Sequence, residues 1–528
     1  MVVWAARKFV LNLIFQSVAQ GFLKNGIMQL QWRISFDINK ADVFTVICAA
    51  LALRGIISLQ PYSGKGTPPM YGDYEAQRHW QEITINLNPT NWYTNSSKND
   101  MQYWGLDYPP LTAFHSHILG RIAKHVNESF VELKTSRGFE SNEHKSFMRL
   151  SVLWADLIIY IPAILSLGFA ITNTLKDKLF LACFFVLSLN PAQILIDNGH
   201  FQYNNISLGL TAFAIYFILK GKHCLAAFCF TLALNYKQME LYHSIPFFVY
   251  LLKVSFSQNS FKNKIITFIK IAVTVLATFV ILWLPWIYSI NSVLTVLRRL
   301  FPLARGVFED KVANFWCSLH TFLKLKNYIS NQGMAALCFI ATLIATLPAN
   351  AMLFVTKTKT TFFLSLTNTA LAFFLFSFQV HEKSILLVTL PATCLFTYKP
   401  HTVIWFLETA TFSMFPLLIR DGLTIPYFAI FLVFFIPLKQ ICLNDYMLPQ
   451  RENKKIKFIL NLSTGYILII SLAAVLISPP QKYPFIWSLI ISFISFCHFF
   501  IFFIYCIFLQ YKHTKGVTSI QSNKQHYS

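Results

Sequence analysis

Long hydrophobic runs alternate with short polar connections along most of this chain. An apolar run of roughly 18 residues is long enough to cross a bilayer as a helix, and the longer runs here reach that length. Together with several shorter runs, they predict fourteen spans. The predicted spans are residues 43–60, 148–174, 179–196, 205–219, 224–240, 242–252, 265–289, 333–355, 361–379, 384–398, 402–418, 424–438, 457–478 and 485–510. The pattern predicts an all-α polytopic membrane protein.

The polar connections form two sets that alternate when fourteen spans are drawn. One set is short and basic: 176–178, 220–222, 253–264, 357–359, 399, 451–457 and 512–515. The other set mixes both charges with histidine and aromatic residues: 61–146, 197–203, 235–243, 305–311, 380–383 and 420–421. Basic loops remain on the cytosolic side of a membrane. We therefore expect both termini in the cytosol and the whole mixed set on the opposite, lumenal side.

The same pattern divides the chain into regions. Residues 1–42 are expected to form a cytosolic N-terminal arm, followed by the first span. The polar region 61–146 is too long for a tight connection and too aromatic for a disordered linker. Helical periodicity at 74–87 and 111–125 predicts interfacial helices within this lumenal loop. Residues 147–510 then form the transmembrane bundle with its lumenal loops, and residues 511–528 form a cytosolic tail.

Composition narrows the class of function. Hydrophobic residues make up 55% of the chain, charged residues 12%, and the net charge is +22. Because the lysines and arginines cluster between spans, this charge indicates topology rather than a nucleic-acid partner. The 10 cysteines form no C-x-x-C pair and fall mostly inside apolar runs, so they predict neither a disulfide framework nor a metal site. The chain also has no P-loop and no G-x-G-x-x-G motif, and no cofactor is predicted.

The mixed connections carry the candidate chemistry. They supply the acidic and imidazole side chains Asp73, Asp107, Glu309, Asp310, His381 and Glu382, and the cations Arg305, Lys311 and Lys383. This mixture fits a site where a phosphate group meets a hydroxyl nucleophile. An ion pathway would instead place its charges along the spans.

Other charged residues lie inside or beside the spans. Asp156 falls deep within one, where polar groups are costly and usually mark function. Asp197 has two readings, a helix cap or a partner for a lysine. Lys237, Glu240 and His243 follow helical spacing, which predicts one shared face and an ion pair three residues apart.

Seven stretches together are similar to a known family. They are G-D-Y-E-A-Q-R-H-W (72–80), W-G-L-D-Y-P-P-L-T-A-F-H-S (104–116), T-S-R-G-F-E-S (135–141), G-H-F-Q-Y-N (199–204), N-Y-K-Q-M-E-L-Y-H-S (235–244), R-G-V-F-E-D-K-V-A-N-F-W-C (305–317) and V-H-E-K-S-I-L (380–386). In this order they resemble the endoplasmic-reticulum glucosyltransferases that use dolichyl-phosphate glucose to extend the lipid-linked oligosaccharide of N-glycosylation. The likeness covers about residues 43–400. L-D-Y-P-P-L-T-A and T-S-R-G-F-E-S resemble the branch that adds the first α-1,3-glucose.

The resemblance implies a GT-C fold in the endoplasmic-reticulum membrane and an inverting, metal-independent transfer. The donor it implies is dolichyl-phosphate glucose, and the acceptor is a dolichyl-pyrophosphate-linked high-mannose oligosaccharide. By the same likeness Asp73 is the general base. The resemblance places Asp107, Glu309, Asp310 and His381 around the donor and acceptor. Arg305, Lys311 and Lys383 are three alternatives for stabilising the departing phosphate.

Two other functions stay open. The sibling glucosyltransferase uses the same donor and adds the second glucose, so that acceptor choice alone separates the two. A transporter or flippase for a lipid-linked sugar needs no general base. The absence of an internal repeat in the sequence, and charges confined to one side, count against transport.

Overall fold

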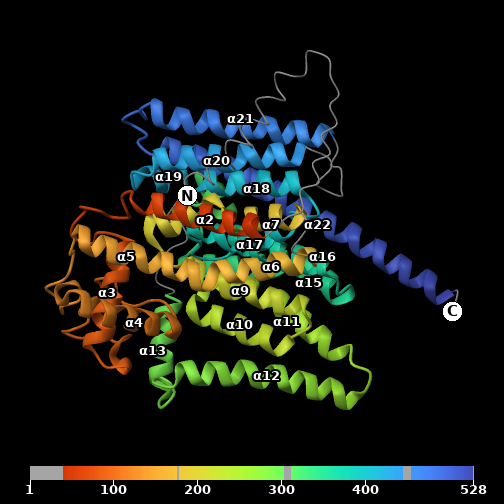
Figure 1. The fold of residues 1–528 in the computed structure, drawn as a ribbon, viewed down its shortest axis with the longest axis horizontal. Helices are drawn as coiled ribbons and strands as arrows, with labels where there is room; N and C mark the ends of the chain where they lie inside the picture. Colours follow the sequence, from red (N-terminus) through yellow and green to blue (C-terminus); the bar gives the residue numbers. More distant parts are fainter. Residues whose placement is uncertain (1–39, 175–177, 303–310, 444–453, 527–528) are drawn as a thin grey trace.

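The computed structural model describes residues 40–174, 178–302, 311–443 and 454–526, and these residues form helices and connections without a β-strand (Figure 1). The α-helices are α2 (Lys40–Ser58), α3 (Asp73–Asn86), α4 (Pro110–Val126), α5 (Asn142–Ala155), α6 (Ile161–Thr172), α7 (Lys178–Ser188), α8 (Pro191–Ile194), α9 (Asn204–Leu219), α10 (His223–Tyr236), α11 (Leu241–Phe256), α12 (Phe261–Trp283), α13 (Ile290–Leu300), α14 (Phe315–Leu323), α15 (Asn331–Val355), α16 (Lys359–Phe376), α17 (Leu386–Cys394), α18 (Pro400–Ser413), α19 (Phe415–Arg420), α20 (Thr424–Leu443), α21 (Lys454–Leu476) and α22 (Ile486–His526). Short 3₁₀ or π turns join them: η2 (Pro89–Asn91), η3 (Glu128–Phe130), η4 (Asp156–Tyr160), η5 (Leu195–Phe201), η6 (Gln238–Glu240), η7 (Leu325–Asn327) and η8 (Glu382–Ile385). Most of the predicted N-terminal arm, residues 1–39, lies outside the described residues.

Each predicted span coincides over most of its length with one helix or with consecutive helices. By length and composition, 8 helical segments of the described chain can cross a membrane. Three further helices are apolar but shorter. The 8 segments are Lys40–Ser58, Asn142–Thr172, Lys178–Phe201, Phe261–Trp283, Asn331–Val355, Lys359–Phe376, Lys454–Leu476 and Ile486–Ser519. The predicted all-α polytopic membrane class is confirmed. The number of fourteen spans stays a prediction.

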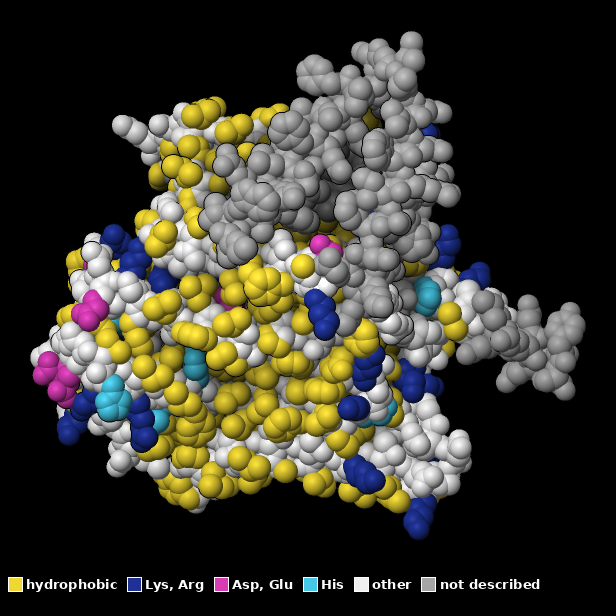
Figure 2. Space-filling model, in the orientation of Figure 1, with side chains coloured by type: hydrophobic (Ala, Val, Ile, Leu, Met, Phe, Trp, Pro, Cys, Tyr) yellow, Lys and Arg dark blue, Asp and Glu magenta, His cyan; other side chains and the backbone are white. Residues whose placement is uncertain are grey.

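Among the described residues, two lysines of the basic set and the helices of the first loop lie at different ends of the bundle. At one end, Lys220 at the end of α9 places its Nζ 4.4 Å from the ring centroid of Phe169 on α6. Lys359 at the start of α16 donates a hydrogen bond to the carbonyl of Ile171, also on α6. The other end carries α3, α4 and α13 (Figure 1). On the face shown in Figure 2, most visible acidic side chains gather at that second end, and a broad hydrophobic surface separates it from lysines and arginines at the first.

The predicted interfacial helices at 74–87 and 111–125 are present as α3 and α4. They pack closely, because a Cβ added at Gly120 of α4 would lie 2.8 Å from the carbonyl oxygen of Gln81 on α3. Buried aromatic residues, among them Trp80 of α3 and Trp286 just after α12, form one cluster that joins these helices to α12 and α13. The polar first loop is therefore packed against the bundle as a defined unit.

Asp156 is neutralised inside the bundle. Its carboxylate lies 3.2 Å from Nε of Arg54 on α2, and both side chains are fully buried. It also accepts hydrogen bonds from the side-chain amides of Asn198 and Asn205, at 3.0 and 2.7 Å. A second Arg54 nitrogen donates to the carbonyl of Ser188 at 2.7 Å. The buried charge thus joins α2, η4, η5 and α9.

Arg54→Met is expected to destabilise the protein by about 3–5 kcal/mol, because it leaves the Asp156 charge buried without its cation. Thermal unfolding of the purified protein in detergent measures this loss. The double variant Arg54→Met/Asp156→Leu should recover much of it, since neither charge then remains. Arg121→Met on the exposed side of α4 is the matched control and should change stability by less than about 0.5 kcal/mol. Equal losses in the single and double variants would contradict the pairing.

Candidate functional site

The turn before α3 orients Asp73. Gly72 has φ of 145°, and an added Cβ would lie 2.8 Å from Ser63 Oγ, so a side chain has no room there. The backbone NH of Asp73 donates to that same Ser63 Oγ at 3.4 Å. In turn, the backbone NH of Ser63 donates to the carbonyl of His200 at 2.9 Å. Asp73 is therefore held beside η5, more than a hundred residues later in the chain.

The Asp73 carboxylate binds three donors through one oxygen. Its Oδ2 lies 2.9 Å from Nε2 of His200 and also accepts hydrogen bonds from Nε2 of Gln202 and Nζ of Lys383. Within the described residues, these three side-chain contacts of the carboxylate all use Oδ2. The side chain keeps 21% of its surface exposed. Oδ1 is therefore the oxygen that can receive a proton from an incoming hydroxyl.

The charge of Asp73 is set by its neighbours. Burial alone would raise the pKa of this carboxyl, but the positive charge of Lys383, followed by His200 and the hydrogen bonds from both, overcomes that effect. The resulting pKa lies well below the usual range of an aspartate. Asp73 is consequently a carboxylate at neutral pH, the form that a general base requires.

His200 links Asp73 to a second carboxylate. Its Nδ1 contacts Oδ2 of Asp421, in the connection between α19 and α20, and the Asp421 side chain is only 2% exposed. Each ring nitrogen of His200 thus faces a carboxylate, where a protonated imidazole can donate at both positions. The sequence places 197–203 and 420–421 in the mixed set but assigns no role to either residue. In the sequence, His200 and Asp421 are marked only by lying in connections of the mixed set. The contact between them forms only when the chain folds.

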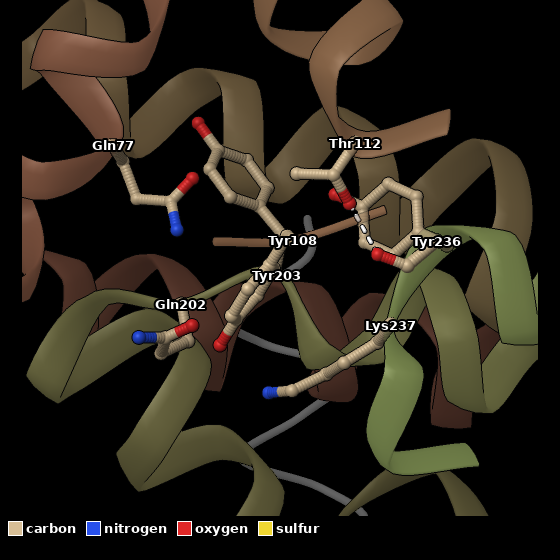
Figure 3. Close-up of a pocket in the computed structure, with 7 residues that line it drawn as sticks. All are labelled: Gln77, Tyr108, Thr112, Gln202, Tyr203, Tyr236 and Lys237. Atoms are coloured by element: carbon tan, nitrogen blue, oxygen red, sulfur yellow. Dashed lines mark hydrogen bonds between the residues drawn. The ribbon is translucent and has the colours of Figure 1, made fainter. Parts of the chain in front are cut away.

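A small polar pocket adjoins this cluster (Figure 3). Its lining residues are Gln77, Tyr108, Thr112, Gln202, Tyr203, Tyr236 and Lys237. Gln202 belongs to both features, because it lines the pocket and donates to Asp73. The lining side chains nearly fill this pocket, and almost no space large enough for a water molecule remains open between them. Its hydroxyl, amide and ammonium groups suit contact with a polar ligand group, which would enter by displacing the lining side chains.

Asp107 lies beside the pocket. Its backbone carbonyl accepts a hydrogen bond from Nε2 of Gln238 at 2.9 Å. Burial, followed by the charge of Asp107, raises the pKa of the pocket residue Tyr108. Asp107 therefore lies where the first loop contacts η6, at the same end of the bundle as Asp73.

The remaining predicted residues are placed differently. His381 Nδ1 lies 2.8 Å from Glu382 Oε2, and His381 is half exposed. Burial raises the pKa of Glu382, but the His381 hydrogen bond and charge outweigh it and bring the pKa to about 2. Lys311 lies with its Nζ 3.7 Å from the ring centroid of Phe485, apart from the donors of Asp73. Arg305, Glu309 and Asp310 lie outside the described residues.

A second charged cluster supports α3. Arg78 donates to Glu75 at 2.6 Å, to Glu82 at 2.8 Å and to Ser136 Oγ at 2.6 Å, all buried. Burial would raise the pKa of Glu82, but hydrogen bonding to His79 and the charge of Arg78 lower it to about 2. Ser136 belongs to the T-S-R-G-F-E-S stretch. That stretch therefore holds α3, and with it Asp73, in position.

The predicted face of Lys237, Glu240 and His243 is partly wrong. His243 Nδ1 lies 2.7 Å from Glu240 Oε2, so this pair forms as expected. Lys237, however, adopts an extended conformation between α10 and η6, and its Nζ donates to the side-chain carbonyl of Asn204. The helix breaks at Lys237 and turns it away from the other two.

Asp197 proves to be a helix cap. Its Oδ2 accepts the backbone NH of Asn205 at 2.7 Å, in the first turn of α9, and its Oδ1 accepts from the Asn204 side chain at 2.6 Å. Across the described ranges, no group of three or more His, Cys, Asp and Glu side chains is arranged to hold a metal ion.

These features define a polytopic α-helical membrane protein with a cluster of charged side chains beside a pocket lined by polar residues. The sequence profile of the ALG6, ALG8 glycosyltransferase family matches residues 46–505, and the chain belongs to this family.

Three relatives illustrate the range of similarity. A probable dolichyl pyrophosphate Man9GlcNAc2 alpha-1,3-glucosyltransferase from Drosophila melanogaster is 54% identical over 86% of this chain and 95% of its own length. The dolichyl pyrophosphate Man9GlcNAc2 alpha-1,3-glucosyltransferase of Rattus norvegicus is 45% identical over 85% and 92%. A probable enzyme of the same name from Arabidopsis thaliana is 40% identical over 88% of each chain.

Proposed function

We propose that this protein transfers glucose from dolichyl-phosphate glucose to a terminal mannose of dolichyl-pyrophosphate-linked Man9GlcNAc2, forming the first α-1,3 linkage. The acceptor follows from the names of the relatives, which share 40–54% of their residues with the chain over most of its length. The observation that carries the chemistry is the Asp73 carboxylate. Three donors hold its Oδ2 beside a pocket lined by polar side chains, and Oδ1 is available to a substrate.

In the proposed reaction, Asp73 Oδ1 accepts the proton of the mannose 3-hydroxyl. The hydroxyl oxygen attacks the anomeric carbon of glucose from the face opposite the phosphate. The new oxygen–carbon bond forms as the bond from that carbon to the phosphate oxygen breaks, and its electron pair leaves with dolichyl phosphate. The β-linked donor thus gives an α-linked product. Because phosphate is already a good leaving group, no second carboxylic acid is needed to protonate it, unlike in a glycosidase.

Among the three cations that the sequence offers, we assign Lys383 to the phosphate. Its Nζ contacts Asp73, so it lies where the base and the leaving group must meet. Lys311 lies over Phe485 instead. Asp107 and the Glu382 and His381 pair are proposed to contact the sugars from the same end of the bundle. Arg305, Glu309 and Asp310 keep their sequence-based assignment to the donor and acceptor.

We further propose that the enzyme resides in the endoplasmic-reticulum membrane with this site on the lumenal side and both termini in the cytosol. The connections at the opposite end are short and basic, as cytosolic loops are. A lumenal site would receive both lipid-linked substrates with their chains in the bilayer and their sugars in the lumen.

The test is glucose transfer by the full-length protein purified in detergent, with a chelator present. We expect transfer from dolichyl-phosphate glucose to the unglucosylated lipid-linked oligosaccharide, with a strong preference for it over the monoglucosylated one. Transfer only to the monoglucosylated acceptor would assign the sibling activity. Translocation of a lipid-linked sugar without formation of a glycosidic bond would assign the transporter.

A further inference from the structure

Lys237 is a cation that no part of the proposed reaction has used. It follows α10, and its side chain reaches along the pocket below Tyr203 toward Gln202 (Figure 3). Its Nζ donates to the side-chain carbonyl of Asn204 and lies 5.1 Å from the ring centroid of Tyr108. Both direct partners are neutral. Among the ion pairs that the described residues form, none within 4 Å includes Lys237.

The electrostatic surroundings of Lys237 are nearly balanced. Burial and then the positive charge of Lys383 lower the pKa of Lys237 to about 8, while Asp197, Asp73 and Glu240 act in the opposite direction. The side chain is therefore mostly protonated at pH 7. A partly buried ammonium without a directly paired anion is costly to maintain. Such a group at the wall of a polar pocket indicates a site for an anionic ligand.

We propose that Lys237 binds the phosphate of the lipid-linked donor, opposite Lys383. This proposal rests on the proposed function, because it assigns the anion to the leaving group of that reaction. Gln202 lines the pocket that contains Lys237 and also contacts Asp73, so the pocket and the base are adjacent. In this assignment the phosphate lies at the pocket end nearest Gln202, between the two lysines.

The negative charge on the phosphate increases during the reaction, and two cations beside it would stabilise that increase. The donor is a phosphodiester with one negative charge. When the bond to the anomeric carbon breaks, the electron pair goes to the phosphate, which becomes a monoester carrying up to two charges near neutral pH. A second ammonium group stabilises the charge that develops in the transition state more than the charge already present in the donor. Lys237 therefore assists departure as well as binding.

The arrangement also couples donor binding to the base. Lys383 contacts Asp73 in the free protein. A bound phosphate competes for this ammonium and withdraws positive charge from Asp73. The proton affinity of Asp73 then rises when the donor is in place, which favours proton uptake from the acceptor at that stage.

The test measures binding of dolichyl phosphate, dolichyl pyrophosphate and uncharged dolichol to the full-length protein, for wild type, Lys237→Met and Lys237→Arg. Lys237→Met should weaken dolichyl phosphate binding about ten- to a hundredfold and leave dolichol binding unchanged. Lys237→Arg should retain most of the affinity. Lys124→Met is the matched control, because Lys124 is exposed on α4 and paired with Glu128.

The pH dependence of dolichyl phosphate binding is a second measurement, and a lysine with a purely structural role would not change it. In wild type, dolichyl phosphate affinity should fall as pH rises through about 8, because Lys237 then loses its charge. In Lys237→Arg the affinity should persist, since arginine stays protonated. The groups facing Lys237 are Lys383, Asp197, Asp73 and Glu240, with Tyr108, Tyr203 and Tyr236 on the pocket wall. Burial raises the pKa of Tyr108 and Tyr203, so these phenols stay neutral through this range.

Three outcomes would overturn the assignment. The first is unchanged dolichyl phosphate binding in Lys237→Met, and the second is an equal loss of dolichol binding, which marks a structural residue. The third is weaker binding of dolichyl pyrophosphate alone, which would show that Lys237 contacts the acceptor and not the donor. None of these depends on catalysis. Wild-type glucose transfer decides the proposed function separately.

Discussion

Asp73→Asn is expected to reduce glucose transfer about a thousandfold, within the range of rate effects measured for general bases. Asparagine has nearly the shape of aspartate, and its carbonyl oxygen can still accept hydrogen bonds from His200, Gln202 and Lys383. The amide, however, cannot take a proton from the acceptor hydroxyl. Single-turnover transfer from dolichyl-phosphate glucose measures the chemical step directly.

Asp100→Asn is the matched control for this substitution. Asp100 is exposed in the same first loop, and its carboxylate accepts only a local hydrogen bond from the backbone of Gln102 among the contacts described. Its transfer rate should equal that of wild type. Binding of dolichyl phosphate to Asp73→Asn should persist, which separates a lost base from a lost site. Retention of more than about a tenth of wild-type transfer by Asp73→Asn would show that another group is the base.

Lys383→Met is expected to lower kcat/KM about a hundredfold and to shift the acid limb of its pH profile upward. The rate falls because the phosphate loses a charge-assisted contact. The limb shifts because Lys383 is the largest of the influences that lower the pKa of Asp73. The lowered pKa keeps Asp73 ionised, and activity present, until the pH falls well below the usual range of an aspartate. Without Lys383 the pKa rises, so activity is lost at a higher pH.

The profile of kcat/KM from about pH 8 down through the acid limb of each variant measures both effects. Lys383→Arg should restore the position of the acid limb, because it restores the charge beside Asp73. Lys124→Met again serves as the control and should match wild type at every pH. A lowered rate with an unmoved limb in Lys383→Met would remove Lys383 from the environment of Asp73 and leave only a substrate contact.

Local patterns in the chain were sufficient for the helices and for the candidate base. A helix satisfies its own backbone groups, and in a membrane it must be apolar along its length, so each span is visible in a short window of sequence. The helices α3 and α4 show the same locality, because their periodicity lies within single segments of the first loop. Asp73 was proposed as the base because the family resemblance rests there on one continuous motif, G-D-Y-E.

Local sequence patterns could not predict which groups surround Asp73. His200, Asp421 and Lys383 come from three connections separated by up to about two hundred residues, and nothing local to any of them specifies the others. The break at Lys237 was missed for a related reason. Its spacing to Glu240 suits a helix, but α10 ends at Tyr236, and Lys237 turns toward Asn204 on α9.

The sequence by itself determined the membrane class, the alternation of basic and mixed connections, and the candidate base, because hydrophobic length and short motifs are properties of neighbouring residues. Only the tertiary structure decided which charges meet. It paired Asp156 with Arg54 inside the bundle, made Asp197 a helix cap, and left Lys237 facing a pocket with neutral partners. The physical reason is that the energy of a charge depends on burial and on partners within a few ångströms. Those partners are brought together by packing between distant segments.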